Sequence, residues 1–165
     1  KLMNELGISE NYLDVVKPAL DKSKKEKRHV ISLKLPNGRI ITGKETNLLS
    51  PASSLVLNAI KEVEKIPDSI DLLSPSVLKP ILKLMPKVTG EKMPLTLQEV
   101  LIALSISSVT NPSVKKALKG ITKLKNCEAH ATYIVNNGDA RILKGLKINL
   151  TCEPVFYSDR LDYSL

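Results

Sequence analysis

The segment 29–43 constrains the fold most, because its pattern is typical of a β-hairpin. Its first half alternates apolar with polar residues, its second half is apolar, and Pro36-Asn37-Gly38-Arg39 lies between them. Asn-Gly tolerates positive φ at both central positions of a type I′ turn, whose twist matches that of paired strands. We therefore expect two antiparallel strands joined at Asn37-Gly38, with Leu35 facing Ile40.

Helix starts are marked by a repeated device, a side chain that can cap a helix followed by proline at the first helical position. It occurs at Ser50-Pro51, Ser74-Pro75 and Asn111-Pro112. Thr96 and Glu99 add the spacing of a capping box. These starts predict helices over 51–65, 75–85, 97–108 and 112–124. The third is almost entirely apolar, so we expect it to be the buried central helix.

The last part of the chain is typical of a β-α-β unit. Residues 128–135 are β-rich, a short helix is expected at 139–144 before Gly145, and 147–151 predict another strand. A strand, helix and strand in this order favour two parallel neighbours in one sheet. Together with the hairpin, they predict an α/β fold with a mixed sheet.

Composition fits one compact domain. The 165 residues are 42% hydrophobic and 25% charged, which excludes a disordered chain. No apolar run approaches the roughly 20 residues needed to cross a bilayer. Two cysteines exclude a disulfide framework, and 3% aromatic residues exclude an aromatic cage or a base-stacking platform.

The ends of the chain favour a piece of a longer protein. The sequence opens at Lys1 without a signal pattern, and Gly7 is expected to end a helix. We expect a helical lead-in over 1–28 from a missing N-terminal part, an α/β domain over 29–154 and a tail over 155–165. A cytoplasmic location with reduced thiols is the default.

The net charge of +8 is unevenly spread, with a basic run at 22–28 and a lysine stripe at 115–125. Such clusters can contact nucleic acid phosphates. Without an accompanying recognition motif, solvated helix faces are the favoured interpretation, and nucleic acid is an unlikely partner.

The first candidate site leads from the second strand of the hairpin into the helix at Pro51. Unpaired N–H groups and the dipole make a helix start favourable for an anion. The polar residues that would contact it are Lys44, Thr46, Asn47, Ser50, Ser53 and Ser54. The spacing of a P-loop is absent. The alternative is that Ser50 simply caps the helix while the next two serines occupy its first turn.

The second candidate site is a late polar cluster. Glu128 and His130 share one face of a strand, and Glu153 joins them if the two terminal strands are adjacent, so the three could act as an acid/base group. Alternation points Cys127 away from His130, which argues against zinc, and no metal site is expected. The alternative is a structural pair beside two buried thiols, Cys127 and Cys152.

Three stretches resemble a known family: "LPNGRIITGKETNLLSPASSLVLNAIK", "EVLIALSISSVTNP" and "CEAHATYIV…LKGLKINLTCEP". They are similar to the C-terminal region of a bacterial family of uncharacterised proteins, the domain-of-unknown-function eighteen-forty-six family. The resemblance covers most of residues 5–154. Its members are considerably longer, and it carries no activity that could be transferred.

The resemblance implies a three-layer sandwich with the topology of the cytidine-deaminase-like fold, without the zinc motif. Zinc deaminases carry H-x-E and P-C-x-x-C at two helix starts. Here the first of these helices begins Ser50-Pro51-Ala52-Ser53-Ser54, and P-C-x-x-C is absent. Deaminase chemistry is therefore not expected.

Two functional hypotheses follow. The first is a domain that binds an anionic, perhaps phosphorylated, small molecule at the helix start, with or without catalysis. The second is a non-catalytic module that forms homo-oligomers or docks on the missing N-terminal region. No cofactor can be named from the sequence, and no membrane partner is expected.

Overall fold

The structure is a computed structural model that describes residues 10–156. Within this range six α-helices, one 3-10 helix and four strands follow one another. In chain order they are α2 (Glu10–Glu26), β1 (Val30–Lys34), β2 (Ile40–Lys44), α3 (Pro51–Val63), α4 (Pro75–Thr89), α5 (Leu97–Ser107), α6 (Pro112–Lys119), η1 (Gly120–Leu124), β3 (Glu128–Ala131), α7 (Asn137–Gly145) and β4 (Asn149–Cys152). The helix end expected at Gly7 lies outside the described residues.

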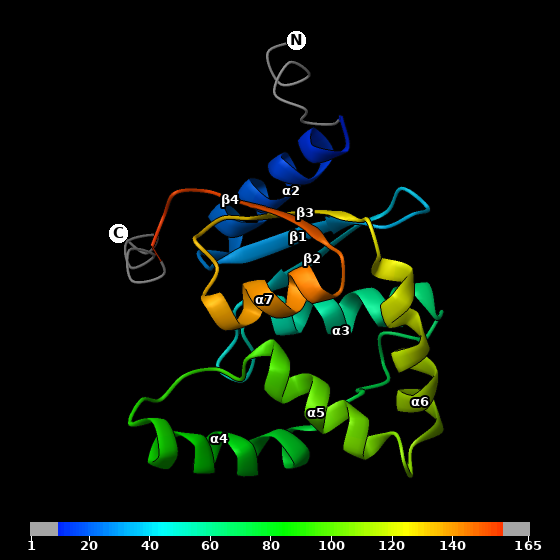
Figure 1. Cartoon of the computed structure of the whole chain (residues 1–165), viewed down its shortest axis with the longest axis vertical. Helices are drawn as coiled ribbons and strands as arrows, with labels where there is room; N and C mark the ends of the chain where they lie inside the picture. Colours follow the sequence, from blue (N-terminus) through cyan, green and yellow to red (C-terminus); the bar gives the residue numbers. More distant parts are fainter. Residues whose placement is uncertain (1–9, 157–165) are drawn as a thin grey trace.

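The four strands form one mixed sheet in the order β2-β1-β3-β4. β1 pairs with β2 and β3 in antiparallel fashion, whereas β3 and β4 are parallel. Helix α2 covers one face of the sheet, and α3 and α7 cover the other (Figure 1). The predicted α/β fold with a mixed sheet and a terminal β-α-β unit is confirmed.

The inner strand β1 is buried on both faces over Val30–Leu33, although Ser32 is polar. The hydroxyl of Ser32 donates to the backbone carbonyl of Val15 in α2, so even-numbered residues of β1 face α2. Ile31 and Leu33 point to the opposite face, where they join the hydrophobic core beneath α3. Helix α2 therefore packs as one layer of the fold, and the predicted division at residue 28 stays a prediction.

The hairpin was predicted correctly, but its register was wrong by one residue. Ile40 pairs with Lys34, not Leu35. The amide of Gly38 donates to the carbonyl of Leu35, and Gly38 alone in the loop has positive φ, at +88°. Pro36, with φ fixed near −65°, suits the second position of a type I turn, and Gly38 then supplies the left-handed residue of a three-residue loop.

Strand β2 lies unusually close to helix α3. A Cβ added at Gly43 would stand 2.2 Å from the backbone nitrogen of Leu55 and 2.5 Å from the carbonyl oxygen of Pro51. Only glycine allows this approach. The contact brings the polar end of β2 beside the first turns of α3.

The four predicted helix starts are confirmed at Pro51, Pro75, Leu97 and Pro112. The capping box of α5 is complete, because Thr96 and Glu99 exchange both hydrogen bonds. Two helix ends differ from the prediction. Helix α4 continues through Pro86 to Thr89. The helix predicted over 112–124 ends at Lys119 as α6, and the 3-10 helix η1 follows from Gly120.

Helix α5 is not fully buried, contrary to its prediction as the central helix. Leu97, Val100 and Leu104 face the core, but Ile102 and Ile106 on the opposite side are 53% and 70% exposed. Helix α4 is still more open, and Leu78 is its one buried residue. An apolar helix sequence predicts that the helix is buried by packing, but it does not indicate that the residues burying it belong to the same chain.

Candidate functional site

The predicted anion loop is divided by the structure between two sides of helix α3. Lys44, Thr46 and Ser54 line a pocket beside β2. Ser50 and Ser53 hydrogen-bond on a different side of the helix, toward the start of α5. Adjacent helical residues differ in direction by about 100°, so Ser53 and Ser54 cannot point to one ligand in the same way.

On the α5 side, the start of α3 is already occupied by a carboxylate of the chain itself. Asp139 is completely buried, and it accepts hydrogen bonds from the Ser50 hydroxyl (2.9 Å) and the Leu97 backbone N–H (2.9 Å). A weaker third donor is the Asn136 side-chain amide at 3.3 Å. The Ser53 hydroxyl, 2.9 Å from that of Ser50, donates to the carbonyl of Leu95.

Three helices therefore begin at one point. Ser50 caps α3, Leu97 is the first residue of α5, and Asp139 lies in the first turn of α7. Their positive dipole ends favour a negative charge between them, and Asp139 supplies it. The sequence contains a local signal for this residue, because Asn136 caps α7 by accepting from the Asp139 N–H. It contains no signal for the distant partners.

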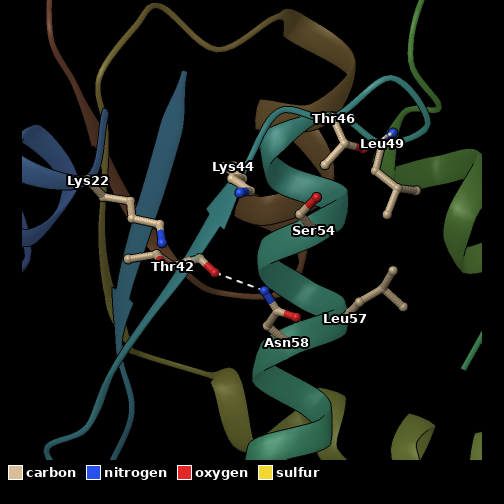
Figure 2. A pocket seen from close by; sticks show the side chains of 8 residues that line it. All are labelled: Lys22, Thr42, Lys44, Thr46, Leu49, Ser54, Leu57 and Asn58. Atoms are coloured by element: carbon tan, nitrogen blue, oxygen red, sulfur yellow. Dashed lines mark hydrogen bonds between the residues drawn. The ribbon is translucent and has the colours of Figure 1, made fainter. Parts of the chain in front are cut away.

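On the other side of α3, a pocket of about 270 Å³ opens between α2, β2 and α3. Figure 2 shows its lining, with Lys22 reaching from α2, Lys44 at the end of β2, and Ser54 on the facing turn of α3. The remaining lining residues are Thr42, Thr46, Leu49, Leu57 and Asn58. The rim is thus polar and basic, and leucines provide the apolar part.

The basic groups of this pocket share one carboxylate. Lys44 and Lys22 lie 3.2 Å and 3.3 Å from the two oxygens of Glu26. Hydrogen bonding from Lys44, and then from Lys22, lowers the pKa of Glu26 below its ordinary value. Two lysines against one glutamate leave one positive charge in excess at the pocket.

The hydroxyl of Ser54 is the unusual group in the lining. The residue is 8% exposed, and its Oγ forms no hydrogen bond with any residue in the described range 10–156. Other polar groups in the lining are engaged. Asn58 donates to the carbonyl of Thr42, and Thr46 Oγ1 accepts from the amides of Leu48 and Leu49. A buried hydroxyl without a partner costs free energy, which a ligand in the pocket would recover.

Asn47 belongs to neither group. It is exposed and, with Thr46, borders a separate hollow whose other side is formed by α4 and the segment before α5. That hollow contains Lys92 as its cation. Of the six predicted contact residues, three therefore line the pocket beside β2.

The predicted acid/base group assembles in part. His130 is fully buried, with Nε2 2.8 Å from a carboxylate oxygen of Glu153 and Nδ1 2.8 Å from the Thr151 hydroxyl. Glu128 instead accepts from the side-chain amide of Asn149 at 3.2 Å. Both ring nitrogens of His130 are thus engaged within the sheet.

The two predicted sites do not converge. His130 pairs with Ser32, which faces α2, so the histidine lies on the α2 face of the sheet. Ser50 and Asp139 lie among the helix starts on the opposite face. The pocket beside β2 and the cluster at β4 are at opposite edges, because β2 and β4 are the outer strands.

The two cysteines are free. Cys127 is buried, but Cys152 is exposed, contrary to the alternative of two buried thiols. Desolvation raises the pKa of both thiols, and the neighbouring Glu128 raises that of Cys127 further. Thiols with raised pKa are weak nucleophiles at neutral pH. The structure therefore gives no support for cysteine-based chemistry.

A buried polar cluster that the sequence did not indicate lies near Asp139. His29 stacks on Tyr133 with ring centroids 4.4 Å apart, and both are essentially unexposed. Burial, and then the negative charges of Asp139 and Glu45, raise the pKa of Tyr133 well above its ordinary value near 10. Tyr133 also borders an apolar cavity of about 280 Å³ at the starts of α3 and α5.

No three His, Cys, Asp or Glu side chains between residues 10 and 156 are grouped as metal ligands. Within the same described part, no helix is long and apolar enough to span a bilayer.

Comparison with known sequences identifies the family. The profile described as "Domain of unknown function DUF1846, C-terminal" matches residues 11–162. The chain belongs to this family. The match extends to residue 162, beyond the stretch 5–154 over which the resemblance was noted.

DUF1846 relatives are found in clostridia. UPF0371 proteins from Clostridium botulinum (strain Eklund 17B), Clostridioides difficile (strain 630) and Clostridium tetani are 40%, 39% and 36% identical to the chain. Each match covers 99% of this chain but 34% of the relative. The chain thus spans about a third of the length of these relatives, and their names state no activity.

Proposed function

We propose that this DUF1846 domain binds an anionic small molecule in the pocket between α2, β2 and α3. The observation that carries the proposal is the Ser54 hydroxyl, buried and without a hydrogen-bond partner among the described residues, beside Lys44 in a basic pocket. An anion would accept from that hydroxyl and from the lysine together. Charge-assisted hydrogen bonds of this kind are the strong ones.

The charge balance supports an anion rather than a neutral ligand. Lys22 and Lys44 share Glu26 at the pocket's edge, so an incoming anion competes with one carboxylate for two cations. The leucines at 49 and 57 offer apolar surface to the rest of the molecule. A volume near 270 Å³ suits a phosphate or carboxylate with a small attached group.

This proposal narrows the set of contact residues predicted from the sequence. Lys44, Thr46 and Ser54 contact the anion, and Lys22 joins them. Ser50 and Ser53 hold the starts of the helices through Asp139. An acid/base role for Glu128, His130 and Glu153 stays a prediction, and it belongs to a different part of the sheet.

The finer fold assignment is also proposed. The sheet order, with a hairpin, a helix and a terminal parallel pair, supports the cytidine-deaminase-like arrangement in three layers. The helix starts that hold zinc in deaminases would then be conserved in position but not in chemistry. Such a fold does not by itself imply an activity.

Isothermal titration with inorganic phosphate, sugar phosphates, nucleotides and carboxylates tests the proposal. For the ligand that binds, Lys44→Gln and Ser54→Ala should each weaken affinity about 10-fold or more, as expected for a hydrogen bond to a charged group. Glu26→Gln should strengthen binding, because it frees both lysines. Lys119→Gln removes the same charge from exposed α6 and serves as the control.

Three results would contradict the proposal. One is that no member of the panel binds. Another is a ligand whose affinity changes equally in Lys44→Gln and Lys119→Gln, because the effect would then reflect the net charge of the protein. Unchanged binding in Ser54→Ala would place the anion elsewhere.

A further inference from the structure

Helices α4 and α5 lie together at the end of the molecule opposite α2 (Figure 1). Each presents apolar side chains to solvent. On α5, Ile106 is 70% exposed, and Ile102 one turn earlier on the same side is also exposed. On α4, Leu84 and Val88 stand one turn apart and are 58% and 69% exposed. These four residues are called the α4–α5 face below.

This exposure is unusual because both helices are well formed. Helix α4 runs for 15 residues and ends with Gly90 in the left-handed conformation, so it is not a frayed segment. Large apolar side chains scattered singly need no explanation, but two on one side of each of two helices indicate a contact surface.

The charge around the face restricts what can cover it. Residues 75–125, which include α4, α5 and α6, contain nine lysines and two glutamates, a net charge of +7. Lys79, Lys83 and Lys87 recur every four residues and form one basic stripe along α4. A second copy of the chain would bring two such surfaces together, which like charges disfavour. A complementary partner has apolar side chains bordered by Asp and Glu.

The length of the relatives supplies a candidate. In each of the three clostridial proteins, about two thirds of the polypeptide lies outside the part matched by this chain. Since the family profile is the C-terminal one, that part includes the region preceding the domain. We propose that the α4–α5 face is the docking surface for this preceding region, through an apolar surface with an acidic border. The proposal is independent of the anion pocket, which lies on the far side of α3.

The test titrates the 165-residue chain with the region that precedes the matched part in the relative from Clostridium botulinum (strain Eklund 17B), by calorimetry. Leu84→Glu and Ile106→Glu should each weaken binding at least tenfold, because each places a carboxylate in the apolar contact. Ile134→Glu changes another exposed isoleucine, just after β3, and should leave binding unchanged. Affinity should fall as salt is raised, since the border is ionic.

A second measurement keeps the proposal testable if the preceding region does not fold alone. In the intact clostridial relative, hydrogen exchange should be slower over the segments equivalent to α4 and α5 than in the isolated chain. Equal exchange rates in both would overturn the proposal. A dimer of the isolated chain that Ile106→Glu dissociates would also overturn the proposal. The same holds for salt-sensitive binding of an oligonucleotide that Leu84→Glu or Ile106→Glu abolishes. Binding that is insensitive to salt would exclude an acidic border.

Discussion

Ser53 and Ser54 are adjacent and both buried, yet they should respond oppositely to the same substitution. Ser53 is fully buried, and its hydroxyl donates to the Leu95 carbonyl at 2.9 Å. Ser54 is 8% exposed, and its hydroxyl has no hydrogen-bond partner within residues 10–156. Ser53→Ala removes a hydrogen bond to the Leu95 carbonyl, whereas Ser54→Ala removes a buried hydroxyl that has no hydrogen-bond partner among the described residues.

The expected magnitudes follow from these contacts. Leaving a buried polar group unsatisfied costs about 1–3 kcal/mol, so Ser54→Ala should raise the free energy of unfolding by up to that amount. Alanine's higher helix propensity adds a few tenths of a kcal/mol. At about 2–4 °C per kcal/mol for a domain of this size, the melting temperature should rise by roughly 2–12 °C. Ser53→Ala should lower the stability by about 1–3 kcal/mol, because it leaves the Leu95 carbonyl without its donor.

Both variants are compared with the parent chain by urea unfolding and by thermal denaturation, without added anions. If Ser54→Ala destabilises the chain as much as Ser53→Ala does, the hydroxyl has a structural partner and the reasoning fails. If Ser54→Ala is stabilising and also loses anion affinity, the hydroxyl has been kept for binding at the expense of stability. That combination is expected at binding sites.

Three further outcomes follow from buried contacts. Asp139→Ala removes the acceptor from two hydrogen bonds of 2.9 Å and should cost about 4 kcal/mol in urea unfolding, whereas Asp71→Ala, at an exposed site, should cost almost nothing. Gly43→Ala places a Cβ 2.2 Å from the backbone nitrogen of Leu55, and circular dichroism melts should show a loss of about 3 kcal/mol or more in the free energy of unfolding. An unchanged melt would mean that β2 and α3 can move apart without cost. Burial raises the pKa of Tyr133 above 10, so the unfolded chain loses the phenolic proton at a lower pH than the folded chain does, and the free energy of unfolding should fall as pH rises beyond about 10. Tyr133→Phe should reduce this pH dependence of the free energy of unfolding, and an identical dependence in the variant would show that other groups cause it.

Local chemistry predicted the elements of this fold well. The helix starts at Ser50, Ser74, Thr96 and Asn111 were correct because a cap and its helix are neighbours in the chain. The hairpin register was wrong although its information was local. Pro36 and Gly38 together favour a type I turn followed by one left-handed residue, whereas the Asn37-Gly38 pair alone predicted a two-residue type I′ turn.

The sequence could not give the orientation of the candidate site residues. Alternation in β3 places His130 and Glu128 on one face, but the sequence cannot say that this face is covered by α2. In the same way, the helical period separates Ser53 from Ser54, but it does not reveal that one faces α5 and the other a pocket. Lys22 was missed as a contact residue because it comes from α2, which precedes the loop by a whole hairpin.

Asp139 connects these observations. Sequence patterns favour an anion at the start of α3, and the structure places one there, but it is the carboxylate of residue 139, 89 positions further along the chain. A helix dipole is satisfied by whichever negative group is nearest, and an internal carboxylate binds without losing the translational freedom that a ligand loses. An external anion is therefore expected where two lysines share one carboxylate and a buried hydroxyl has no partner among the described residues. This is the side of α3 that faces Lys44 and Ser54.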